Sequence, residues 1–216
     1  MSSYKVRYQT LDFGDTDIHI QTLRDNQQYS DAHNVASDLG ISSALWPLFG
    51  QLWPSGKILA NHMLDFDIKG KRILELGCGL ALSSHVLNGR NADITATDYH
   101  PEVETFLNEN VRINGGKAIP YIRTGWADEV SDLGVFDLII GSDVLYERGH
   151  ATLLVAFIEQ HAKEHTEVII VDPGRGHRGH FTALMCDLGY THTFLTPEAV
   201  DCLDEPYQGK ILFFQR

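Results

Sequence analysis

The sequence of 216 residues has little cysteine, no long hydrophobic run and few basic side chains. Its three cysteines, Cys78, Cys186 and Cys202, are an odd number without CxxC spacing, which indicates neither a disulfide framework nor a zinc cluster. No stretch approaches the roughly 20 consecutive apolar residues of a membrane span, and no apolar segment follows the first basic residues. We therefore expect a reduced, cytoplasmic protein without a membrane helix or a secretory signal.

Acidic side chains outnumber basic ones: 29 Asp and Glu against 17 Lys and Arg give a net charge of −12. This charge repels nucleic acids and polyanionic membranes on average, tolerates a basic partner, and in most proteins simply serves solubility. With 43% hydrophobic residues the composition is that of an ordinary globular protein. The length favours one domain over residues 1–216, with an N-terminal flank over 1–50 and a core over 51–216. We expect a monomer that binds no nucleic acid.

The first fifty residues differ in pattern from the rest. Tyr4–Tyr8 and Asp17–Leu23 alternate with the period of half-buried strands on either side of a Gly14-Asp15 turn, which predicts a hairpin. A stretch rich in tryptophan and proline then leads into a helix that begins near Pro54. This part of the chain is expected to flank the main fold.

From Lys71 onward, short apolar runs alternate with amphipathic ones, which is typical of βαβ units. The predicted strands are Arg72–Leu76, Asp93–Thr97, Ile119–Ile122, Phe136–Gly141 and Glu167–Val171. The predicted helices are Ala81–Leu87, Pro101–Ile113, His150–His161 and Phe181–Leu188. Two last strands, Tyr190–Leu195 and Lys210–Gln215, are joined only by a loop and should pair antiparallel at one edge. The expected fold is a doubly wound α/β protein with a mainly parallel seven-stranded sheet and an antiparallel C-terminal hairpin.

A glycine turn with the sequence E-L-G-C-G over residues 75–79 follows the first predicted strand of this sheet and opens a helix. Such a turn lets the backbone approach a ligand closely. The dinucleotide fingerprint GxGxxG needs a glycine at the position of Leu82, which counts against NAD or FAD. An acid before the glycines suits a ligand with cationic groups better than a pyrophosphate. Asp98, at the end of the next strand, stands where a carboxylate binds a ribose diol, although such an acid is often only a helix cap.

Together with Asp143-Val144-Leu145-Tyr146 after the fourth strand of the sheet, these features resemble the seven-stranded (class I) S-adenosylmethionine-dependent methyltransferases. More narrowly, they resemble the protein-lysine methyltransferase branch, which carries a D-x-x-Y motif at this place. The resemblance extends over 52–216 and includes the tryptophan-proline entry at Trp53, but Ala81 stands where many members have a third glycine. It implies S-adenosylmethionine as the cofactor and a lysine of a protein as the acceptor.

By this resemblance, the cofactor-binding residues would be Trp53, Glu75, Gly77, Cys78, Gly79, Asp98, Tyr99, Trp126 and Ser142. Glu75 and the two glycines would face the methionine half of the cofactor, Asp98 would hold the ribose hydroxyls, and Trp126 would lie beside the adenine. Trp53 would close over the cofactor, and Ser142 would border the methyl-transfer channel. For a single tryptophan, a place in the core is the common alternative.

Asp143 and Tyr146 would be the catalytic residues. A lysine amine, with a pKa around 10.4, must be oriented and deprotonated before it can attack a methyl group. The Asp143 carboxylate could accept a hydrogen bond from the amine and stabilise the positive charge that develops on nitrogen, while Tyr146 could fix its geometry. The alternative for the pair is a helix N-cap followed by a packing tyrosine. The sequence leaves open whether Asp143 or water takes the proton.

The sequence contains 11 histidines, which raises the hypothesis of a metal site. His177 and His180 lie in a glycine-rich run over 172–180, and their spacing is not that of an HExxH helix, so we expect no metal. A loop at this place could contact a substrate or cap the next helix, and Arg175 and Arg178 could be no more than solvated charges. Three other functions stay open: methylation of a small molecule or of another protein atom, a binding module of this fold without catalysis, and an NAD enzyme.

Overall fold

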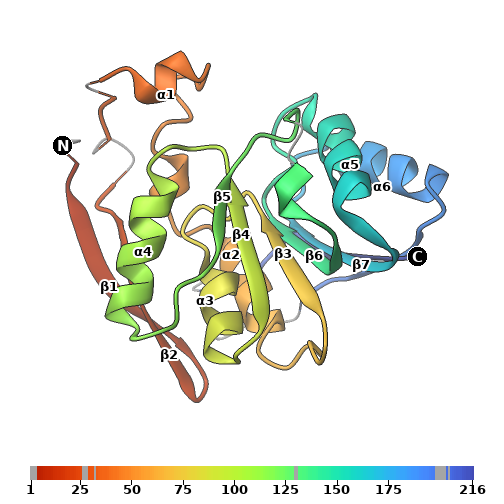
Figure 1. The fold of residues 1–216 in the computed structure, drawn as a ribbon, viewed down its shortest axis with the longest axis horizontal. Coiled ribbons are helices and arrows are strands. Elements are labelled where there is room, and N and C mark those ends of the chain that lie inside the picture. Colours follow the sequence, from red (N-terminus) through yellow and green to blue (C-terminus); the bar gives the residue numbers. More distant parts are fainter. Residues whose placement is uncertain (1–3, 26–28, 32, 129–130, 198–202, 204) are drawn as a thin grey trace.

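A computed structural model describes residues 4–25, 29–31, 33–128, 131–197, 203 and 205–216. Its main sheet has seven strands in the order β5-β4-β3-β6-β7-β9-β8 (Figure 1). The strands are β3 (Arg72–Leu76), β4 (Asp93–Asp98), β5 (Tyr121–Arg123), β6 (Phe136–Ser142), β7 (Ala162–Asp172), β8 (Thr191–Leu195) and β9 (Lys210–Gln215). All neighbours from β5 to β7 pair parallel, whereas β9 pairs antiparallel with both β7 and β8. The predicted fold class is confirmed.

Helices cover both faces of this sheet. The helices are α1 (Val35–Asp38), α2 (Pro54–His62), α3 (Leu82–Gly89), α4 (Val103–Ile113), α5 (His150–His161) and α6 (Arg178–Asp187), with 3-10 turns at Leu48–Gly50 and Ser131–Leu133. Apolar residues of α2, α3 and α4 join one buried cluster, and those of α5 and α6 join the other. Neighbours in β7 alternate between them, because Ile169 belongs to the first cluster and Ile170 to the second. Among the described helices, none is long and apolar enough to cross a membrane.

Several element boundaries differ from the sequence prediction. β5 begins at Tyr121 and not at Ile119, since Pro120 lacks the N–H that a ladder hydrogen bond needs. β7 begins five residues before the predicted Glu167, directly after α5, and its first pairs with β6 are irregular. α6 begins three residues before the predicted Phe181, as soon as the chain has passed Gly176 with its positive φ of 96°.

The N-terminal hairpin is confirmed as β1 (Val6–Phe13) and β2 (Thr16–Leu23), which pair antiparallel around the Gly14-Asp15 turn. Its first strand differs from the predicted Tyr4–Tyr8, because the pairing continues up to the turn. The hairpin lies along α4, at the left of Figure 1. Asn110 of α4 and Asn114, directly after its last residue, hold the backbone of β2: Asn110 Oδ1 accepts a hydrogen bond from Gln21 N at 2.7 Å, and Asn114 Oδ1 accepts one from His19 N at 2.8 Å. The hairpin therefore packs on a helix rather than extending the main sheet.

Candidate active site

A cavity of about 670 Å³ lies at the carboxyl ends of β3, β4 and β6. This is the size of a small-molecule site and the place where open α/β sheets bind ligands. The residues that line it include all eleven positions that the sequence suggested: Trp53, Glu75, Gly77, Cys78, Gly79, Asp98, Tyr99, Trp126, Ser142, Asp143 and Tyr146. The fold thus brings these residues, from positions 53 to 146, into one space.

The glycine turn between β3 and α3 places three alternate residues in the left-handed region. The φ angles are 56° at Gly77, 53° at Gly79 and 56° at Ala81. A Cβ at Gly79 would stand 3.1 Å from the carbonyl oxygen of Phe49, so glycine is needed there for space as well as for conformation. Ala81 adopts the same conformation at a cost of about 1–2 kcal/mol, so the missing third glycine strains the turn without changing its course.

Asp98 ends β4 with its carboxylate directed at the glycine turn. Its Oδ2 accepts a hydrogen bond from the backbone N–H of Gly79 at 2.9 Å, and its Oδ1 accepts one from the N–H of His100 at 2.8 Å. Burial raises the pKa of the carboxyl, and these backbone donors oppose the shift. Since a carboxylate has about four lone-pair sites, both oxygens can accept further hydrogen bonds from a ligand in the cavity.

Glu75 is buried at the end of β3, on the wall of the cavity. Its Oε2 accepts hydrogen bonds from both the N–H and the hydroxyl of Ser84, in the first turn of α3. Burial raises its pKa to about 7, and the Ser84 bonds and the nearby Asp98 charge act in opposite directions on that value. Glu75 therefore has a structural task at the N-terminus of α3 besides any contact with a ligand.

Aromatic rings form the wall next to the D-x-x-Y residues. The rings of Trp126 and Tyr146 both contact His150 edge-on, with centroid distances of 5.0 and 4.5 Å. The ring of Trp126 also lies over the turn, since a Cβ on Gly77 would be 3.6 Å from it. Tyr146 is 39% exposed, so its ring faces the open side of the cavity. His150 is a lining residue that the sequence analysis assigned only to a helix.

The N-terminal flank lines the cavity with Ile41, Leu45 and Leu48, and Trp53 follows directly after it. The indole N–H of Trp53 donates to the carbonyl oxygen of Leu48 at 3.0 Å. The hydroxyl of Tyr99, after β4, donates to the carbonyl oxygen of Leu39 at 2.6 Å. These bonds tie the flank to the core around the cavity.

Asp143 follows β6 in the left-handed region, with φ at 54°. It is not a helix N-cap, because the next described helix, α5, begins only at His150. Its carboxylate is held by Arg175: Nε donates to Oδ1 at 2.6 Å and a terminal nitrogen donates to Oδ2 at 2.7 Å. The guanidinium also stands over the ring of Trp53, 5.9 Å from its centroid.

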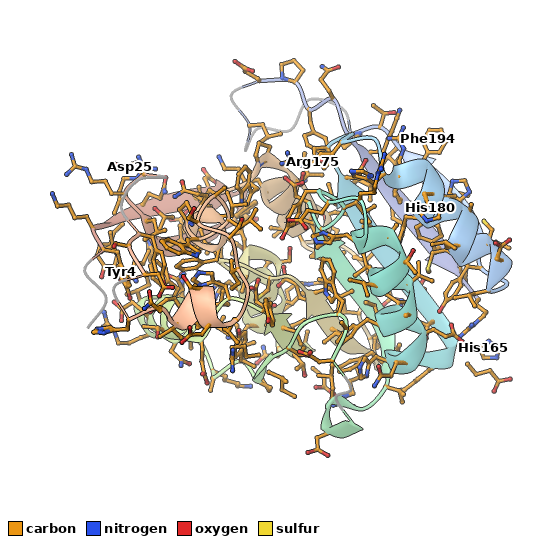
Figure 2. All side chains as sticks on the ribbon, turned by 90° about the horizontal axis from the view of Figure 1, so that it is seen from above. Tyr4, Asp25, His165, Arg175, His180 and Phe194 are labelled. Carbon is orange, nitrogen blue, oxygen red and sulfur yellow. The ribbon has the colours of Figure 1, made fainter. Side chains whose placement is uncertain are left out.

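Of the possibilities for this loop, Arg175 is more than a solvated charge, since it lines the cavity and pairs with Asp143. Figure 2 shows it near the middle of the molecule, whereas His180 lies further out on α6. The sequence did contain a signal for this contact, since Arg175 follows β7 and Asp143 follows the neighbouring parallel strand β6. The carboxyl ends of neighbouring parallel strands meet at one edge of a sheet. Arg178 stays 40% exposed, 4.0 Å from Asp172. Among the described residues, no group of three or more metal-ligating side chains could hold an ion.

Comparisons with known proteins place the chain among methyltransferases. The family model described as lysine methyltransferase matches residues 42–181. The mouse electron transfer flavoprotein beta subunit lysine methyltransferase (Mus musculus) is 30% identical over 139 residues, which are 62% of this chain and 52% of that protein. A histidine protein methyltransferase 1 homolog of Dictyostelium discoideum is 35% identical over 120 residues, 51% of this chain and 38% of that protein. The chain thus spans about half the length of these relatives or less.

Solved structures show the same fold. The magnesium protoporphyrin IX methyltransferase of Synechocystis, solved with bound S-adenosylmethionine, superposes with a TM-score of 0.57 at 16% identity, over 74% of this chain and 77% of that chain.

Proposed function

Because the chain belongs to the lysine methyltransferase family, we propose that it transfers a methyl group from S-adenosylmethionine to the side-chain amine of a lysine in a protein. The observation that supports this most is the meeting of Asp98 and Asp143 in one cavity, one beside the glycine turn and the other at the end of β6. The first suits a ribose and the second a cationic acceptor.

The residues present fit S-adenosylmethionine. Gly79 keeps the turn free of side chains, Asp98 has lone pairs left for two hydroxyls, and the aromatic ring of Trp126 offers a face for a base. The acidic Glu75 suits the positive charge of the ligand. When bound, this cofactor supplies a methyl group on a cationic sulfur. A structural neighbour of this fold was solved with the same molecule bound.

Asp143 is the residue that would bind the acceptor amine. Its side chain is 10% exposed, so a hydrogen bond from an acceptor amine to this carboxylate is screened little by water. The carboxylate orients the nitrogen and stabilises the positive charge that develops on it. Partial burial raises the pKa of Tyr146 to about 12, so its hydroxyl is protonated at neutral pH and acts as a donor. Both side chains line the same cavity as the glycine turn.

The test is transfer of radiolabel from S-adenosylmethionine to proteins of a cell lysate, followed by mass spectrometry of the labelled band. We expect the label on a lysine side chain, and strongly reduced labelling after Asp143→Ala. Label on a carboxylate or on a small metabolite would contradict the lysine proposal while leaving the cofactor proposal standing. Cofactor binding without any transfer would favour a binding module.

Histidine is the second candidate acceptor, because one relative at 35% identity is named for histidine methylation. An imidazole is largely neutral at pH 7 and needs no deprotonation before attack. A methyl group found on a histidine in the lysate experiment would select this alternative.

The remaining expectations stay predictions: one domain over residues 1–216, a monomer, a cytoplasmic location and no nucleic-acid partner. Size-exclusion chromatography with light scattering tests the oligomeric state.

A further inference from the structure

The ion pair of Asp143 and Arg175 occupies the acceptor side of the cavity. Two parallel N–H···O bonds of 2.6 and 2.7 Å give it the fork geometry that makes such pairs the stronger ones. Its two ends differ in exposure: the Asp143 side chain is 10% exposed, the Arg175 side chain 43%. The carboxylate is thus a fixed part of the wall, and the cation reaches it from the solvent side.

We infer that Arg175 is an internal substitute for the acceptor: in the free protein its guanidinium occupies the place on Asp143 that the acceptor amine takes, and the acceptor must displace it. The inference rests on the proposed function. A carboxylate with an aromatic ring beside it is a site for an organic cation, and Asp143 with Trp53 already holds one. A guanidinium stays protonated at physiological pH, so Arg175 can fill the place without being methylated.

The backbone around Arg175 suits such an exchange. It stands between Gly174 and Gly176, with φ angles of 95° and 96°, and a Cβ added to either glycine would meet no atom within 4 Å. The segment is anchored on its inner side, where Gly174 N donates to Asp172 Oδ2 at 3.0 Å. Arg175 can therefore swing while the ends of β7 and α6 stay in place.

A second carboxylate lies near the displaced cation. Asp172 is 1% exposed, and its Oδ1 has no hydrogen-bond partner among the described residues. Burial raises its pKa, and the backbone hydrogen bond from Gly174 and the positive charges of Arg178 and Arg175 act against that shift. Arg178 already stands 4.0 Å from Asp172 Oδ2, so the buried Asp172 keeps this end of the loop attractive to a cation when Arg175 leaves Asp143.

The consequence is selectivity. An acceptor that offers only an amine competes with an intramolecular cation, whereas an acceptor protein with further contacts can displace it. Arg175 thereby disfavours free amines and exposed lysines that bind nowhere else on the protein.

The first experiment turns Arg175 into an acceptor. In Arg175→Lys the Nζ is as many bonds from Cα as the arginine Cζ, so the amine reaches the same place. In the reaction its neutral nitrogen bonds to the methyl carbon and the C–S bond breaks. Sulfur keeps the electron pair as S-adenosylhomocysteine, and the nitrogen then loses its proton to solvent. We expect a methyl group on residue 175, formed at a rate independent of protein concentration.

Arg178→Lys is the matched control, since it places a lysine at the end of the same loop, where Arg178 approaches Asp172 and not Asp143. We expect no label there. Equal labelling of the two variants, or a rate for Arg175→Lys that rises with protein concentration, overturns the inference. No label on a folded Arg175→Lys variant, while the wild type labels a lysate protein, overturns it and leaves the proposed function intact. If the wild type labels nothing, the proposed function fails, and the inference with it.

The second experiment needs no cofactor. Phenylglyoxal modifies accessible guanidinium groups, and mass spectrometry reports the rate at each arginine. Asp143→Asn should raise the rate at Arg175 about fivefold, as expected for loss of a partly exposed ion pair, and leave Arg178 unchanged. An unchanged rate at Arg175 overturns the inference. Should Arg175→Lys not fold, Arg175→Gln replaces it: its initial rate with the lysate acceptor should rise, and an equal or lower rate counts against the inference.

Discussion

The two sides of the cavity are held in different ways. Around the glycine turn, backbone N–H groups of Gly79 and Ser84 bind the carboxylates of Asp98 and Glu75. On the acceptor side, the carboxylate of Asp143 binds the side chain of Arg175, between two glycines. Backbone contacts form together with the strands and helices and are fixed once the chain folds. In a side-chain pair at a loop, a ligand can take the place of one partner. The glycine turn is therefore a preformed binding site, whereas the site at Asp143 must open before it can bind.

The largest effect is expected at Asp143. Asp143→Ala removes the group that orients the amine and stabilises its charge, so methyl transfer should fall about 1,000-fold, within the range of such terms. The measurement is initial rate with the lysate acceptor, with circular dichroism as the check on folding. Glu104→Ala removes an exposed carboxylate on α4 and serves as the control, with an unchanged rate expected. Wild-type turnover in Asp143→Ala would remove that residue from the chemistry.

The glycine turn offers a sharper test on the other side. Gly79 and Gly115 both have positive φ, 53° and 62°, but only at Gly79 would a Cβ meet another group, the Phe49 carbonyl. Gly115→Ala should lower the free energy of unfolding, measured with urea, by about 1 kcal/mol, and Gly79→Ala should lower it further because its Cβ also meets the Phe49 carbonyl. Only Gly79→Ala should also weaken S-adenosylhomocysteine binding, about tenfold or more. Equal binding losses in the two variants would show that the turn does not contact the ligand.

Glu75 should make the stability of the protein depend on pH. Its pKa is raised by burial from 4.5 to about 7, so its contribution is fully present below pH 4.5 and is lost as the pH rises through about 7. Relative to Glu75→Gln, the wild type should therefore lose about 2–3 kcal/mol of unfolding free energy between pH 4.5 and 8. Urea titrations of both proteins at these two pH values measure it. Parallel changes in the two proteins would contradict the assignment.

The smallest effect is expected at Tyr146. Its ring contact with His150, at 4.5 Å, survives in Tyr146→Phe, and only the hydroxyl is lost. Loss of one hydrogen bond corresponds to about a two- to tenfold lower transfer rate, with unchanged cofactor affinity. Steady-state rates together with a binding titration separate the two. A loss as large as that of Asp143→Ala would make the hydroxyl a principal catalytic group.

The sequence predicted the surroundings of the glycine turn better than the contacts of Asp143. The strand before residue 75, the glycines and Asp98 are neighbours along the chain or follow consecutive strands, so their meeting follows from the βαβ pattern. The contact between Asp143 and Arg175 depends on how two loops after neighbouring strands direct their side chains. The hydrophobic periodicity of the sequence predicts strands and helices, but it does not predict side-chain directions in loops. For the same reason, Asn110 and Asn114 look like solvent-facing helix residues until β2 packs on them.

The most direct test of the separation between the two sides is a calorimetric titration of S-adenosylhomocysteine into the wild type, Asp98→Ala and Asp143→Ala. Asp98→Ala removes an acceptor for two hydroxyl groups and a partner of the glycine turn, so its affinity should fall about 100-fold. Asp143→Ala should stay within about threefold of the wild type, because the proposed function assigns Asp143 to the acceptor amine and not to this ligand. An equal loss in both variants, or a greater loss in Asp143→Ala, would contradict the account.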